Sequence, residues 1–192
     1  MVLVTIYEEL VPPVPKIFRS QDLVVIFNRC FLKPFNTRLE GGGEEPLYLP
    51  AKSDGNARII FREDYFSSGL HEISHWCIAG NERRKVEDYG YWYAPDGRSP
   101  EQQQLFETAE IKPQALEWIF NRACGYRFNI SADNLMAGMG VSEVFKQHIL
   151  EQAKKYCKNG MSPRAMIFAS ALADFYGIAS FLCADDYDLE QL

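Results

Sequence analysis

Residues 70–80 of this 192-residue chain read LHEISHWCIAG and contain two of its three histidines. His71 and His75 are four residues apart, and residues at this spacing lie on one face of an α-helix about one turn apart. Two imidazoles placed in this way can bind the same divalent metal ion. Glu72 points roughly a quarter-turn away, so its carboxylate can meet a water molecule on the metal without being a ligand. The stretch therefore predicts a metal-binding helix.

The residues around this motif are consistent with a helix that packs on one side. Ser67 or Ser68 can cap its start, and Gly80 can end it after about Ala79. Apolar side chains recur away from the histidines and can anchor the helix in a core: Leu70, Ile73 and Cys77.

Two imidazoles leave a metal ion with too few protein ligands, so a third ligand is expected. The best candidates are Glu107 and Glu110, which lie three apart on a later predicted helix and so share a face. We expect Glu110 to bind the metal, because it lies at the irregularity predicted at Pro113 and shares a face with Gln114. Glu107 is expected to orient a histidine or to be the alternative ligand.

Two histidines and one carboxylate do not identify the metal or the reaction. The same ligand set occurs in zinc peptidases, where Glu72 would be the general base, and in non-haem iron oxygenases. A closed site with four ligands would instead indicate a structural metal in a binding module. Glu72 is the residue that we expect to be catalytic, although the attack by an oxygenase does not itself require a general base.

The rest of the chain predicts an α+β fold: a mostly helical single domain with a small β-sheet. Residues 1–18 are expected to be an N-terminal extension, because the Val11–Pro15 segment is rich in proline, and residues 19–192 to form the domain. Gly41–Gly43 predicts a flexible loop or tight turn. Two short strands are expected at 47–49 and 57–61. Further helices are expected at 20–33, 99–123 with a kink or restart at Pro113, 142–157 and 162–176.

Composition narrows the class of protein. The net charge of −6 argues against direct nucleic-acid binding, which relies on a basic surface. The five cysteines are widely spaced and odd in number, which favours free thiols in a reducing compartment. No signal peptide or membrane span is recognisable, so a cytoplasmic protein without membrane partners is expected.

Several longer blocks resemble the bacterial elongation factor P hydroxylase family. They are residues 70–80, 89–98 and 110–118, with residues 35–39 and 46–50 as earlier segments, and the resemblance spans roughly residues 20 to 135. It implies an enzyme that hydroxylates a lysine of elongation factor P already carrying a β-lysyl group. It also implies a non-haem centre, with Fe(II) as the expected metal and dioxygen as co-substrate, on His71, His75 and a downstream Glu. On this motif we expect a helix like that of the zincins.

The substrate that this resemblance implies suggests further site residues. Aromatic walls suit the methylene stem and ammonium group of a modified lysine, and a carboxylate suits its amines. The His-x-Asp…His order of 2-oxoglutarate oxygenases is absent, so 2-oxoglutarate is not expected as co-substrate. The candidates for substrate binding are Tyr91, Tyr93, Asp96 and Gln114.

Overall fold

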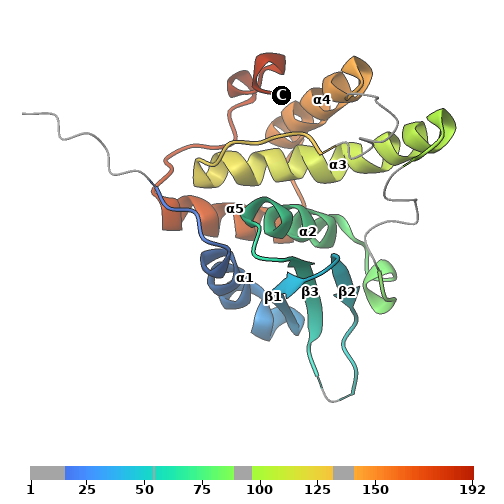
Figure 1. Cartoon of the computed structure of the whole chain (residues 1–192). Helices are drawn as coiled ribbons and strands as arrows, with labels where there is room; N and C mark the ends of the chain where they lie inside the picture. Colours follow the sequence, from blue (N-terminus) through green and yellow to red (C-terminus); the bar gives the residue numbers. More distant parts are fainter. Residues whose placement is uncertain (1–15, 54, 89–96, 132–140) are drawn as a thin grey trace, which may run out of the picture.

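The computed structural model describes residues 16–53, 55–88, 97–131 and 141–192 (Figure 1). Its helices and strands confirm the predicted α+β class, since helices dominate and accompany one small sheet. The elements are α1 (Ser20–Phe35), β1 (Thr37–Gly43), β2 (Leu47–Leu49), β3 (Ala57–Arg62), α2 (Phe66–Ile78), the 3-10 turn η1 (Arg83–Lys85), α3 (Pro100–Cys124), α4 (Glu143–Asn159), α5 (Pro163–Tyr176), and the 3-10 turns η3 (Ala184–Asp186) and η4 (Leu189–Gln191).

The sheet has the strand order β1-β3-β2, with β3 parallel to β1 and antiparallel to β2. The two predicted strands are present as β2 and β3, but β1 was not predicted. The prediction of a loop or turn at Gly41–Gly43 is wrong, because these glycines form the end of β1. A Cβ atom on Gly41 would lie 2.8 Å from Phe61 Cζ, so glycine allows the strand to approach β3 closely.

The metal helix α2 lies between the sheet and α3 (Figure 1). Its apolar side is buried as predicted, with Leu70, Ile73 and Cys77 at 0% exposure. The predicted serine cap is wrong: the helix begins at Phe66, and no side chain caps it. Ser68 Oγ instead accepts a hydrogen bond from the backbone N–H of Arg62, at the end of β3.

Helix α3 is central, since it contacts α2, α4 and α5 (Figure 1). Ser99 caps it in a capping box with Gln102, as the sequence predicted. The helix does not restart at Pro113 but continues to Cys124. Pro113 lacks an N–H and so removes one helical hydrogen bond. Burial of residues on both sides of it, including Phe106 and Leu116, keeps the two halves in one helix.

Two apolar clusters enclose α3. One joins α1, α2, the sheet and α5; the other joins α3, α4 and the C-terminal segment around Tyr187. Ser142 and Ser162 cap α4 and α5, as predicted. Phe18 contacts Phe66, Tyr126 and Tyr176, so packing begins before residue 19; the boundary between extension and domain stays a prediction. Among the described helices, none is long and apolar enough to cross a membrane.

Candidate metal centre

Helices α2 and α3 bring three of the predicted ligands together. The Nε2 atoms of His71 and His75 are 3.1 Å apart. Oε1 of Glu110 lies 3.2 Å from Nε2 of His75, and its Oε2 lies 3.6 Å from Nε2 of His71. One ligand atom from each residue lies within 4.8 Å of the others. The three side chains can therefore converge on one ion.

The helices explain this convergence. The i and i+4 positions of α2 place both imidazoles on the same face, with ring centroids 4.7 Å apart. The opposite face of α2 is buried, which fixes the helix so that the histidines face α3. Glu110 lies in the middle of α3 and is 1% exposed, so it meets the two rings from the facing helix.

A further carboxylate, Glu117, supports His71 from behind. Its Oε2 atom lies 2.8 Å from Nδ1 of His71, and its side chain is buried. This residue was not among the predicted site residues. A signal was present, because Glu117 follows Glu110 by seven residues, two turns along the same helix face. A carboxylate on Nδ1 fixes the tautomer and directs the Nε2 lone pair toward the metal.

Gln114 lies between these two glutamates on α3 and is fully buried. Its amide donates to the Ser131 carbonyl at 2.6 Å and accepts from the Ser131 N–H at 3.2 Å. Its Nε2 atom also lies 3.4 Å from Oε2 of Glu110. These contacts indicate that Gln114 holds Glu110 in place, and they give no support to the predicted contact with substrate.

Glu107, the alternative ligand, has other partners in the structure. Glu107 accepts hydrogen bonds from Ser142 Oγ at 2.8 Å and from Gln103 Nε2 at 3.3 Å. It is not part of the cluster of His71, His75 and Glu110. The remaining candidates fall outside the described residues: Tyr91, Tyr93 and Asp96.

Charges are strongly coupled within the centre. Burial opposes protonation of His71, but the hydrogen bond and charge of Glu117, followed by the charge of Glu110, raise its pKa to about 10. Burial likewise opposes ionisation of Glu110, but the charge and hydrogen bond of His75 and the charge of His71 lower its pKa to about 2. Burial raises the pKa of Glu117, so the His71–Glu117 pair retains its proton above neutral pH. A metal ion that binds at Nε2 of His71 therefore has to displace a proton from the ring.

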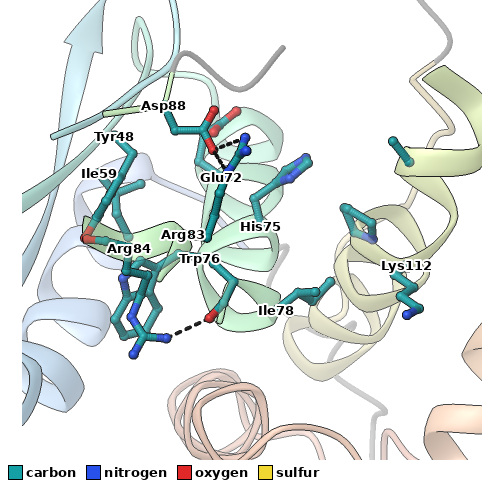
Figure 2. A pocket seen from close by; sticks show the side chains of 13 residues that line it. Tyr48, Ile59, Glu72, His75, Trp76, Ile78, Arg83, Arg84, Asp88 and Lys112 are labelled. Carbon is teal, nitrogen blue, oxygen red and sulfur yellow. Dashed lines mark hydrogen bonds and ion pairs between the residues drawn. The ribbon is translucent and has the colours of Figure 1, made fainter. Parts of the chain in front are cut away.

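A pocket of about 230 Å³ adjoins the centre and shares His75 with it (Figure 2). Glu72 lines the same pocket, and burial raises the pKa of its carboxyl group. The pocket is walled by α2, η1 and the sheet on one side and by α3 on the other: its lining residues are Tyr48, Ile59, Glu72, His75, Trp76, Ile78, Ala79, Arg83, Arg84, Asp88, Ala109, Lys112 and Pro113.

The donor set fits a divalent transition metal. Two imidazole nitrogens and one carboxylate oxygen suit either zinc or iron, and three protein ligands leave positions for water or a reactant. Glu117 supplies the supporting hydrogen bond that metal-binding histidines usually have. The arrangement can therefore support metal-assisted hydrolysis or oxygen activation next to a pocket.

Comparison with known proteins separates these possibilities. The model of the elongation factor P hydroxylase family matches residues 26–186, a range that includes the whole centre. A relative from Haemophilus influenzae named elongation factor P lysine hydroxylase is 52% identical over 160 residues, which cover 82% of this chain and 89% of the relative. The resemblance inferred from the sequence motifs is confirmed: this chain belongs to the elongation factor P hydroxylase family.

Proposed function

We propose that this protein is a metal-dependent hydroxylase that acts on a lysine of elongation factor P. The observation that carries the proposal is the cluster of His71, His75 and Glu110 at the edge of a pocket, in a chain of this family. We further propose that the lysine already carries a β-lysyl group and that the metal is Fe(II), with dioxygen as co-substrate. A cytoplasmic location follows from a substrate that works in translation.

The residues of the site would have different roles. His71, His75 and Glu110 would hold the metal, and Glu117 keeps the His71 ring in the tautomer that presents Nε2. When bound, iron supplies the redox chemistry that activates dioxygen. The pocket next to His75 admits the substrate side chain, and its apolar walls exclude water from it.

The net reaction converts a C–H bond of the substrate into C–O–H. One oxygen atom of dioxygen enters the product, and the other leaves as water after taking two electrons and two protons from an added reductant. A zinc peptidase would use the same three ligands and would need Glu72 to activate water. Membership of the elongation factor P hydroxylase family does not favour this peptidase alternative.

Intact-mass analysis of elongation factor P tests the proposal. The protein is reconstituted with Fe(II) or with Zn²⁺, and each form is incubated with β-lysylated elongation factor P, with and without dioxygen and a reductant. The expected result is the mass of one added oxygen atom with iron, dioxygen and reductant together, and no change with zinc. Peptide cleavage by the zinc form, without oxygen addition by the iron form, would establish the peptidase instead.

A further inference from the structure

The pocket beside the metal centre has mainly apolar walls. Ile59 lines it from β3, and Pro113 lines it from α3. Trp76 and Ile78 extend the apolar wall along α2. Such a surface suits a linear hydrocarbon chain, and His75 places the metal ligands at its edge.

Glu72 is one of the ionisable side chains that line the same pocket. The residue is only 9% exposed, and no residue in the described part of the chain donates a hydrogen bond to its carboxylate. A carboxylate that has lost most of its water and has gained no protein donor is poorly solvated, and its remaining exposure is to the pocket. The side chain is therefore positioned for a donor that enters the pocket with a ligand.

The cations that line the pocket are directed to other partners. Arg83 forms an ion pair with Asp88, with Nη2 and Oδ2 2.6 Å apart (Figure 2). Arg84 donates to the Ala79 carbonyl at 2.7 Å, at the end of α2. Lys112 lies on the α3 side and is directed away from Glu72 in Figure 2. The donor for Glu72 is thus expected from the ligand.

We propose that Glu72 binds an ammonium group of the β-lysyl group on the substrate's modified lysine, while the apolar wall contacts the methylene groups of this side chain. The inference rests on the proposed function and deepens it, because it assigns the group that selects a cationic side chain. An ammonium donates up to three hydrogen bonds and neutralises a carboxylate, so it satisfies the unpaired group that the pocket holds. Glu72 would therefore anchor the side chain so that a carbon atom of the same chain lies next to the metal.

Binding measurements test this role separately from turnover. Elongation factor P carrying the β-lysyl group is titrated into the metal-loaded protein in the absence of dioxygen, which gives Kd. KM and kcat for the same substrate are then measured in the presence of dioxygen and a reductant. Glu72→Gln keeps the shape of the side chain and removes its charge, so Kd and KM should rise by at least about tenfold, with metal content unchanged. The matched control is Glu143→Gln on the exposed start of α4, which should leave both constants unchanged.

Small competitors provide a test that does not depend on the folding of a variant. Pentylamine should inhibit the wild-type enzyme competitively and at least about tenfold more strongly than 1-pentanol, because only the amine carries the charge. Ala109→Leu narrows the pocket from α3 with a residue that helices favour, and it should weaken both competitors together.

Two outcomes would overturn the assignment. One is equal inhibition by pentylamine and 1-pentanol. The other is a Glu72→Gln protein that loses kcat but retains Kd and KM, since this would indicate proton transfer in place of anchoring. Failure of the proposed function would look different, because wild-type protein would then add no oxygen to elongation factor P under any condition.

Discussion

Nδ1 of His71 lies 2.8 Å from Oε2 of Glu117, so a carboxylate from α3 holds the ring from the side away from the expected metal. Because Glu117 is buried and the His71 side chain is only 11% exposed, water has little access to this contact. Glu110, two turns earlier on α3, approaches Nε2 of the same ring. One helix thus supplies both a candidate ligand and the group that orients another ligand.

Removing this carboxylate should weaken metal binding without removing a ligand. Glu117→Ala and Glu117→Gln are expected to lower the affinity for Fe(II) or Zn²⁺ by about 10- to 100-fold, because the His71 ring loses its fixed tautomer. Competition with a chelator measures the affinity. Glu143→Gln, on the surface of α4, is the matched control. An unchanged affinity in both Glu117 variants would mean that the contact does not position the ring.

Metal affinity should depend on pH over an unusual range. His71 has a pKa of about 10 without metal, and Nε2 must lose its proton to bind an ion. The affinity should therefore rise by about tenfold per pH unit from pH 7 to pH 9. For a histidine with an ordinary pKa near 6.5, the rise would level off above that value. A plateau between pH 7 and pH 9 in a metal titration would contradict this expectation.

The proton on His71 should also stabilise the metal-free protein. A rise in pH that strengthens metal binding should therefore lower the free energy of unfolding of the metal-free form. Because the folded-state pKa of His71 is above its unfolded value, protonated His71 stabilises the fold fully below about pH 6.5. That contribution should be lost as the pH rises toward 10. The free energy of unfolding, measured by urea titration with a chelator present, should fall over this interval more in wild type than in Glu117→Gln.

Alanine substitutions of the two glutamates considered as third ligand should have clearly different effects on metal affinity. Glu110→Ala removes an oxygen that faces both imidazoles, so metal affinity should fall by more than 100-fold, or about 3 kcal/mol. Glu107→Ala removes the hydrogen bond from Ser142 at the start of α4, so it should cost about 1 kcal/mol of stability and leave metal binding intact. Metal titration and thermal unfolding of both variants check this, and the reverse order would move the ligand to Glu107.

The metal helix could be predicted because the residues that define it are close together in the sequence. His71 and His75 are four residues apart, and their shared helical face follows from helix geometry alone. The apolar residues on the opposite side followed the same period and are buried in the structure. By contrast, Glu110 required a choice between two helix positions, since the sequence does not show how α3 crosses α2.

Long-range contacts account for what the sequence did not reveal. Strand β1 exists through parallel pairing with β3, and its Gly41 and Gly43 read locally as a turn. Glu117 gains its role only when α3 lies against α2, so its distance of 46 residues from His71 concealed the contact. The pocket likewise combines residues from β2, β3, α2, η1 and α3.

The end of the metal helix depends on a residue from another helix, and this gives a final prediction. Nη2 of Arg164, in α5, lies 2.6 Å from the Ala79 carbonyl and 3.1 Å from those of Trp76 and Cys77. These carbonyls lie in the last turn of α2, where a positive charge is favourable. Arg164→Ala should therefore lower the free energy of unfolding by about 1–3 kcal/mol.

The effect should extend to the metal centre, because His75 lies in the turn that Arg164 holds. We expect a modest loss of metal affinity in Arg164→Ala, smaller than that in Glu117→Ala, since the guanidinium touches the backbone and no ligand. Arg164→Lys should be intermediate, because it keeps the charge but loses the planar fork that reaches several carbonyls. The matched control is Arg127→Ala, at an exposed position after α3. If Arg164→Ala and Arg127→Ala unfold at the same urea concentration, the last turn of α2 is held by other contacts, such as the hydrogen bond from Ser162 Oγ to the Cys77 carbonyl.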